Sequence, residues 1–503
     1  MHRRQASSLH YESEPNHMRP NSSTRDSEFM PALSRRQMLG RLGNGCDLAG
    51  LAAVLADELI ADRRSLHAAE TPVAASSSAA APLAPKPPHH EPRARRVIYL
   101  FMNGGPSQVD TFDPKPALQT HAGQAPPAEL VNTMRRTKGT LMPSPFKFSK
   151  QGELGIEVSE LFPHLSRCID DLCVIRSMHT NLPNHEPSFL MMNSGETQPT
   201  RPSLGSWLTY GLGSENQNLP GYVVLCPGQP TVGPALWSNS FLPGIYQGVH
   251  INNSELDPRK VIKHLANPHV SPADQRRQLE LLRKINGVHL ADRPRDPQLE
   301  SRIQALEMAF RMQTEAQEAF DISRETAETR KLYGDGEFAN GCLIARRLAE
   351  RGVRITQVYF GGGQPWDDHG DIANHREHAR QSDQAIAGLL TDLKSRGLLE
   401  DTLVVWGGEF GRTPTAEGSK GRDHNNLGFS MWLAGGGVRG GYVHGATDEI
   451  GFSAVEGKVH VHDLHATMLH LLGIDHTKLT YRYSGRDFRL TDVKGDIVTQ
   501  IIA

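Results

Sequence analysis

The chain has few cysteines, almost no net charge and no long apolar segment. Its 503 residues include five cysteines, none in a Cys-x-x-Cys pair, which argues against a zinc ribbon or a thioredoxin-like motif. With 54 basic and 56 acidic residues the net charge is -2, so we expect no general affinity for nucleic acid or anionic membrane. No segment reaches the roughly 18 apolar residues of a membrane helix, so we expect no integral membrane segment.

The N-terminal region resembles an export signal. Residues 34–39 read Ser-Arg-Arg-Gln-Met-Leu, similar to the twin-arginine motif, and the apolar stretch 48–55 follows, too short to span a bilayer. We predict that residues 1–66 are an export segment and that the protein is periplasmic or secreted. A disordered basic tail is the alternative. If the protein is exported, Cys168 and Cys173 are close enough in sequence to pair; otherwise both are expected as buried thiols.

The rest of the chain predicts one linker and one domain. Residues 67–95 are rich in Ala, Ser and Pro, a composition typical of a disordered linker. Residues 96–503 are predicted as a single α/β domain, with irregular insertions at 114–160 and 241–300. Continuous apolar runs typical of buried parallel strands alternate with helical patterns, which predicts a mostly parallel sheet sandwiched by helices. The apolar runs lie at 97–102, 172–175, 221–225, 355–360, 403–406 and 429–433.

Acids and histidines gather directly after several of these predicted strands, at 366–371, 408–412 and 422–426. Ligands bind at the carboxyl ends of strands in open α/β sheets, and carboxylates with imidazoles at such a place suit a divalent metal or the handling of an oxyanion. Each residue also has an ordinary structural interpretation. Asp367 can be a helix cap, and Glu409 with Arg412 can be a salt bridge.

Two further segments carry candidate residues. After the first strand, Asp110 and Asp113 could be strong metal ligands and Asn103 a weak one, although a plain turn explains Asp113 better. In the loop 179–188, Ser188, Thr180 or His185 could act as a nucleophile, an acid/base group or a ligand. A surface loop with helix-capping residues explains this loop nearly as well.

The order of these motifs resembles that of the alkaline phosphatase and sulfatase superfamily. More narrowly, the chain resembles the bacterial domain-of-unknown-function family fifteen-oh-one, over about residues 95–503. The resemblance implies the superfamily's α/β fold but supplies no established activity. It rests on the motifs at 101–107, 110–116, 366–370, 408–414, 421–424, 434–437 and 471–475.

Three positions depart from the superfamily pattern. His185 stands where the resemblance places the sulfatase nucleophile. Glu409-Phe410 replaces an Asp-His pair, and Asn103 takes the place of the first acidic ligand. One metal ion, a rearranged pair of ions and no metal are all compatible with these departures.

The leading hypothesis is an exported hydrolase of sulfate or phosphate esters, whose partner is a small anionic ester or a sulfated glycan. The resemblance implies a divalent ion (Zn, Ca or Mg), held by Asp367, His369, Glu409 and His424 with Asn103. His185 would be the general base or nucleophile, and Arg412 would hold the anion. The alternative is a catalytically degenerate member of the superfamily that binds an anionic glycan or takes part in a surface complex.

Overall fold

The computed structural model describes residues 83–128, 139–254, 270–292 and 297–503. The predicted export segment at 1–66 lies outside these ranges, as does the first part of the predicted linker. The statements below concern the described residues.

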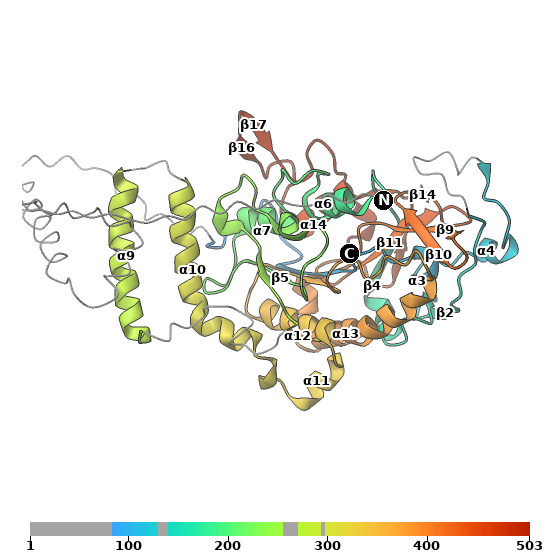
Figure 1. Cartoon of the computed structure of the whole chain (residues 1–503), viewed down its shortest axis with the longest axis horizontal. Coiled ribbons are helices and arrows are strands. Elements are labelled where there is room, and N and C mark those ends of the chain that lie inside the picture. Colours follow the sequence, from blue (N-terminus) through green and yellow to red (C-terminus); the bar gives the residue numbers. More distant parts are fainter. Residues whose placement is uncertain (1–82, 129–138, 255–269, 293–296) are drawn as a thin grey trace, which may run out of the picture. The chain divides into compact units, whose positions relative to one another are not determined.

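A mixed, mostly parallel sheet forms the centre of the domain (Figure 1). Among its described strands only β11 runs against its neighbours, and it pairs antiparallel with β4 on one side and β8 on the other. The predicted α/β class and the mostly parallel sheet are therefore confirmed. In spatial order the strands are β12 (Tyr442–His444), β4 (Leu172–His179), β11 (Phe429–Ala434), β8 (Thr402–Gly407), β1 (Arg96–Phe101), β7 (Ile355–Tyr359), β5 (Tyr222–Leu225) and β6 (Val249–Ile251), with β15 (Val459–His460) also paired to β4.

The centre of the sheet is buried and mainly apolar. Strand β1 pairs parallel with β7 and β8, and all six of its residues are buried. This explains why its sequence reads as an unbroken apolar run rather than an alternating one. Between β8 and β11, the rings of Trp406 and Trp432 stack with centroids 5.9 Å apart.

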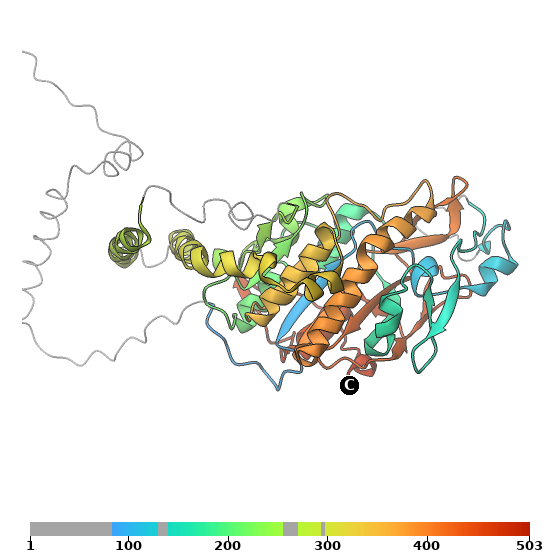
Figure 2. The ribbon, with the colours of Figure 1, turned by 90° about the horizontal axis from the view of Figure 1, so that it is seen from below.

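Helices cover both faces of the sheet. Helices α6, α7 and α14 lie on one face, and α11, α12 and α13 lie on the other (Figures 1 and 2). The apolar stripe of α13 is buried against the core, as Leu389 and Leu393 show. The helices are α3 (Gln108–Thr111), α4 (Pro116–Thr120), α6 (His185–Ser194), α7 (Leu204–Leu212), α9 (Pro272–Asp292), α10 (Pro297–Phe320), α11 (Ala327–Tyr333), α12 (Glu337–Glu350), α13 (His375–Ser395) and α14 (Val461–Leu471).

Four two-stranded ribbons lie outside the central sheet within the described ranges. One of them, β9 with β10, contributes to the candidate site because it follows the carboxyl end of β8. The ribbons are β2 (Phe148–Gln151) with β3 (Ile156–Ser159), β9 (Gly411–Glu417) with β10 (Gly421–Asn425), β13 (Ala446–Thr447) with β14 (Ala454–Glu456), and β16 (Tyr481–Tyr483) with β17 (Arg486–Phe488).

Residues 83–95, which the composition assigns to a linker, pack against the domain without forming a helix or a strand. Leu83 is buried in the core, and the backbone N–H of His89 donates to the carbonyl of Gly473 (2.8 Å). Local composition gave no sign of this packing, because the partners of these residues lie far away in the sequence.

None of the helices in the described ranges is long and apolar enough to cross a membrane. Cys168 and Cys173 are both free thiols, so no disulfide joins them in this structure. Burial raises the pKa of Cys173 to about 12, which leaves its thiol protonated at neutral pH.

Candidate metal centre

The candidate site lies at the carboxyl end of the sheet. Strands β1, β4, β7 and β8 all run in the same direction, so the loops that follow them meet at one edge. These loops carry Gly104, His185, Asp367 and Glu409, while the β9–β10 ribbon adds His424. The structure thus brings together residues separated by more than 300 positions in the sequence.

Three imidazoles converge on one carboxylate oxygen. The Nε2 atoms of His185, His369 and His424 lie 3.2, 2.9 and 3.1 Å from Oδ1 of Asp367. One nitrogen from each ring and one carboxylate oxygen all lie within 4.8 Å of one another. Four of the residues predicted from the sequence to form the site therefore share one point. We refer to His185, Asp367, His369 and His424 as the His₃Asp cluster.

Each of the three rings is oriented by an acceptor on its other nitrogen. Nδ1 of His185 donates to Oε1 of Glu409 (2.6 Å), and Nδ1 of His424 donates to the carbonyl of Pro183 (2.7 Å). Nδ1 of His369 donates to a carboxylate oxygen of Glu417. Carboxylates and carbonyls only accept, so the proton of each neutral ring is on Nδ1 and the lone pair is on Nε2.

This assignment leaves electron-rich atoms facing one another. Nε2 of His369 lies 2.9 Å from Nε2 of His424, and both approach the carboxylate of Asp367. Nε2 of His185 is buried and has no hydrogen-bond partner among the described residues, although Asp367 is 3.2 Å away. Lone pairs at these distances repel unless a proton or a cation lies between them. The donor set therefore fits a metal ion.

The local charges act differently on the individual imidazoles. Burial alone would lower the pKa of His185, but the close carboxylates of Asp367 and Glu409 outweigh it and raise that pKa, so a metal ion at this site would have to displace a proton from His185. Burial also lowers the pKa of His424, and the nearby charge of Arg412 adds to the effect. A neutral His424 is in the protonation state that metal binding requires.

Asp367 is ionised and held from behind by Arg412. Burial would raise the pKa of Asp367, but the adjacent imidazoles of His185 and His424 lower it far below its usual value, and the charge of Arg412 adds to this. Nη2 of Arg412 donates to Oδ1 of Asp367 (2.6 Å).

The other donors of the Arg412 guanidinium are directed into the protein. Nε of Arg412 donates to the carbonyl of Gly105 (2.9 Å), and Nη2 also donates to the carbonyl of Gly104. The Arg412 side chain is 0% exposed. It therefore presents no open edge to a ligand in this structure.

Glu409 and Asn103 lie behind the His₃Asp cluster. The Glu409 carboxylate is fully buried and accepts the backbone N–H of Gly104 (3.1 Å) as well as the proton of His185. The Asn103 amide nitrogen donates to the carbonyls of Gly361 and Gly363, at 2.9 and 2.6 Å. The amide oxygen of Asn103 is buried and has no hydrogen-bond partner among the described residues. The cluster itself thus contains neither of these two predicted ligands.

Gly104 allows the loops after β1 and β7 to touch. It has φ +113°, and a Cβ built at this position would lie 2.6 Å from the backbone nitrogen of Asp367. Any larger residue would push the Asp367 loop away, so glycine is required here.

A second carboxylate–histidine pair supports the same loop. Nδ1 of His375 donates to Oδ2 of Asp368 (2.6 Å), and its Nε2 accepts the backbone N–H of Ser107 (3.0 Å). Asp371 and His375 are four residues apart, but they do not lie on one helix. Asp371 instead caps the short 3-10 turn at Ile372–Asn374, and α13 begins only at His375.

The two acids after β1 have structural partners. Asp110 pairs with the fully buried Arg422, whose Nε lies 2.7 Å from Oδ2 of Asp110. Asp113 is buried beside Lys115 (3.0 Å) and Arg176 (3.7 Å). Neither acid belongs to a metal-type cluster in the described part of the chain.

Sequence reasoning missed two of the groups that orient the imidazoles. Glu417 reaches His369 because the β9–β10 ribbon folds back at 418–420, with Gly421 opposite Glu417. The glycine of that turn, Gly418 at φ +62°, was the available signal. The carbonyl of Pro183 had no side-chain signal at all.

Comparison with known families places this geometry in context. Residues 94–502 match the family described as "Protein of unknown function (DUF1501)". The chain belongs to this family. The family predicted from the order of the motifs is thereby confirmed, and the match spans the complete His₃Asp cluster. Among curated protein sequences, none matches this DUF1501 chain.

Several solved structures are similar to this DUF1501 protein at low identity. The PsFucS1 sulfatase of Pseudoalteromonas sp. is 12% identical, covering 82% of this chain and 72% of its own, with a TM-score of 0.34. The phosphonate monoester hydrolase of Silicibacter pomeroyi is 13% identical, covering 62% and 68%, with a TM-score of 0.29. A protein in the alkaline phosphatase superfamily from Vibrio parahaemolyticus is 10% identical, covering 78% and 69%, with a TM-score of 0.31.

Proposed function

We propose that this protein is a metal-dependent hydrolase of sulfate or phosphate esters that acts in the periplasm or outside the cell. The observation that carries the proposal is the convergence of three imidazole Nε2 atoms and Oδ1 of Asp367 on one point. The export part of the proposal rests on the twin-arginine-like residues 34–39 alone.

The donor set favours zinc over calcium or magnesium. Calcium and magnesium prefer oxygen ligands, whereas imidazole nitrogens suit zinc, which commonly takes four ligands. The His₃Asp cluster supplies three nitrogens and one oxygen. When bound there, the ion would act as a Lewis acid toward an ester oxygen and lower the pKa of a water molecule.

The surrounding residues keep the cluster in its binding form. Glu409 and Glu417 hold the Nδ1 protons of His185 and His369, and so keep each Nε2 lone pair turned inward. Arg412 orients Asp367 and stabilises its negative charge. In this proposal His185 is a ligand. Its role as a base or nucleophile, and a direct contact of Arg412 with the anion, stay sequence-based predictions.

Metal content and turnover test the proposal together. We expect about one equivalent of zinc per chain in the purified wild-type protein, measured by elemental analysis, together with hydrolysis of an aryl sulfate or an aryl phosphate. Asp367→Ala with His424→Ala should lose both the metal and the turnover. His121→Ala, which removes an exposed histidine after α4, is the matched control and should retain both. Full turnover in the double variant would refute the assignment.

A non-catalytic role is the second candidate, and the burial of Arg412 favours it. Ser188 adds to the case, because its hydroxyl is buried and donates to the carbonyl of Leu182 (2.6 Å) instead of facing the cluster. In this alternative the protein binds an anionic glycan or a surface partner without hydrolysing it. Tight glycan binding without turnover of any ester in the screen would decide for this candidate.

A further inference from the structure

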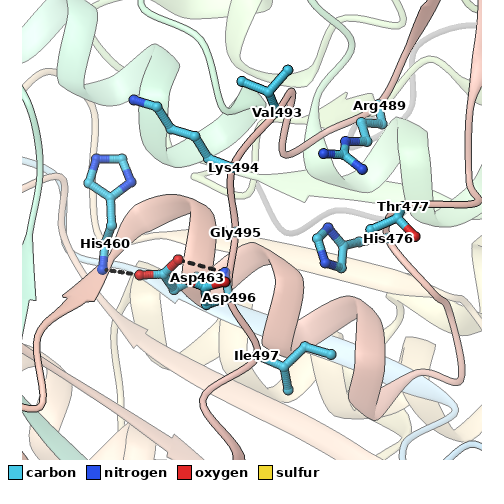
Figure 3. A pocket seen from close by; sticks show the side chains of 10 residues that line it. All are labelled: His460, Asp463, His476, Thr477, Arg489, Val493, Lys494, Gly495, Asp496 and Ile497. Carbon is cyan, nitrogen blue, oxygen red and sulfur yellow. Dashed lines mark hydrogen bonds between the residues drawn. The ribbon is translucent and has the colours of Figure 1, made fainter.

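A pocket of about 630 Å³ opens beside strand β15, at the amino end of helix α14 (Figure 3). Its walls come from the C-terminal part of the chain, at 460–463, 476–477 and 489–497. The volume is in the range of small-molecule binding sites. None of the metal ligands or catalytic residues proposed above lines it.

Two cations lie at opposite ends of this pocket. In Figure 3 the ammonium group of Lys494 lies on the side of His460, and the guanidinium of Arg489 lies on the side of His476. Within the described ranges, no carboxylate forms an ion pair with either cation. Nε of Arg489 donates to the carbonyl of Asp492, which leaves the two Nη groups available.

The imidazoles in the pocket are neutral hydrogen-bonding groups rather than further charges. Burial lowers the pKa of His460 to about 3 and also lowers that of His476. Nδ1 of His460 accepts the backbone N–H of His462 (3.1 Å), so the neutral ring carries its proton on Nε2. Nδ1 of His476 lies 2.8 Å from the hydroxyl of Thr491.

The two carboxylates in the pocket, those of Asp463 and Asp496, differ in how far their charge is already stabilised by hydrogen bonds. Both oxygens of Asp463 accept backbone N–H groups, from His460 (2.9 Å) and Asp496 (2.8 Å), so its charge is already stabilised. The Asp496 carboxylate is exposed and can accept hydroxyl donors. Two separated cations, neutral imidazoles and one open carboxylate therefore suit a ligand with anionic groups and hydroxyls spaced along it. They suit a single inorganic anion less well.

The pocket adjoins the His₃Asp cluster through one short loop. Nε2 of His460 donates to Oδ1 of Asn181 (3.1 Å) on the pocket side of residues 180–184. At the other end of the same loop, the carbonyl of Pro183 holds His424, and His185 follows at the start of α6. Residues of this loop thus contact both sites, so a chain-like ligand that spans the loop would reach both of them.

We infer that this pocket is a glycan subsite, in which Lys494 and Arg489 bind two anionic substituents of a sulfated oligosaccharide. The inference rests on the proposed function for the identity of the substrate, because it places the non-reacting part of an ester substrate here. It names sulfated sugars as the substrate class.

Calorimetry with heparin tetrasaccharides, before and after chemical desulfation, tests the inference on the full chain with and without EDTA. We expect Lys494→Ala and Arg489→Ala each to weaken binding of the sulfated form about twofold to fivefold, as for exposed or partly exposed charge pairs. Arg489→Lys should retain part of the affinity. Lys150→Ala, an exposed lysine on β2, is the matched control and should bind normally. Melting curves confirm that each variant is folded.

The outcomes distinguish ligand binding in the pocket from ester hydrolysis at the metal centre. Binding that depends on Lys494 and Arg489 but needs neither metal nor turnover supports the subsite, even if ester hydrolysis is never found. In an active enzyme, the two variants should raise KM for a sulfated sugar and leave kcat/KM for an aryl sulfate unchanged. Equal binding by the Lys494→Ala, Arg489→Ala double variant, or equal binding of desulfated sugar, overturns the subsite and leaves the metal centre untouched.

Discussion

A substitution of Glu417 gives the most specific test of the proposed metal site. Its carboxylate accepts the Nδ1 proton of His369, which fixes the ring with Nε2 turned toward Asp367. In Glu417→Gln the side chain keeps its size but can turn its amide N–H toward Nδ1. Nδ1 would then accept, and the proton would move to Nε2. This change removes the lone pair that a metal needs without removing any ligand.

The solvent exposure of the Glu417–His369 contact limits the loss of zinc affinity that we expect. Outer partners of metal-ligating histidines are typically worth about 10- to 100-fold in metal affinity, which is about 1.4 to 2.7 kcal/mol. The Glu417 side chain is 41% exposed and that of His369 is 33% exposed. Water therefore screens and partly replaces the contact, and we expect a loss near tenfold.

The assay is competition for zinc against a chromophoric chelator at pH 7.5. Glu456→Gln, which changes an exposed glutamate on β14, should bind zinc as the wild type does. Without metal, Glu417→Gln should unfold at nearly the wild-type urea concentration, because a partly exposed pair contributes little to stability. Wild-type zinc affinity in Glu417→Gln would refute the orienting role. A large loss of metal-free stability would mean that the contact is structural.

Three further results are expected. Burial lowers the pKa of His465 from 6.5 to about 3, so the unfolded chain takes up this proton first. The free energy of unfolding is then lost as the pH falls from 6.5 toward 3, by at most about 1.4 kcal/mol per pH unit, and His465→Gln should flatten this slope in urea titrations. Asp110→Asn should lower the free energy of unfolding by about 3–5 kcal/mol, because the charge of Arg422 is left buried without its partner. Metal content should be unchanged. Loss of metal at unchanged stability would instead identify Asp110 as a ligand. Gly104→Ala should lose zinc as well as stability. In Gly228→Ala the residue has φ +73° and nothing lies within 4 Å of the added Cβ, so this control should lower the free energy of unfolding by only about 1 kcal/mol and retain zinc. Equal effects in both variants would contradict the steric argument.

The sequence predicts the sheet well because a strand buried on both faces must be apolar throughout. The runs at 97–102 and 403–406 became β1 and β8 for this reason. The reversed direction of β11 could not be predicted in the same way. A buried antiparallel strand inside a mixed sheet carries the same apolar pattern, and its direction depends on contacts with β4 and β8.

The site was partly predictable because its ligands follow strands. Asp367, His369 and His424 sit in polar motifs that interrupt apolar runs, so their chemistry stands out in the sequence. What surrounds them depends on register and burial, which the sequence does not display. Glu409 carries the same charge as Asp367, yet only the fold shows that it orients His185 from behind the cluster.

The β9–β10 ribbon holds His424, Glu417 and Arg412 but pairs with no strand of the central sheet among the described elements. The buried guanidinium groups of Arg412 and Arg422 already attach this ribbon to Gly105 and Asp110, and Thr415 forms a bridge with Leu141. The rest of the cluster comes from the core loops, so a zinc ion would add a further link between this ribbon and the body of the protein. Amide hydrogen exchange along 411–425 should therefore slow when zinc is added, because the bound ion would stabilise the position of the ribbon in addition to its chemical role.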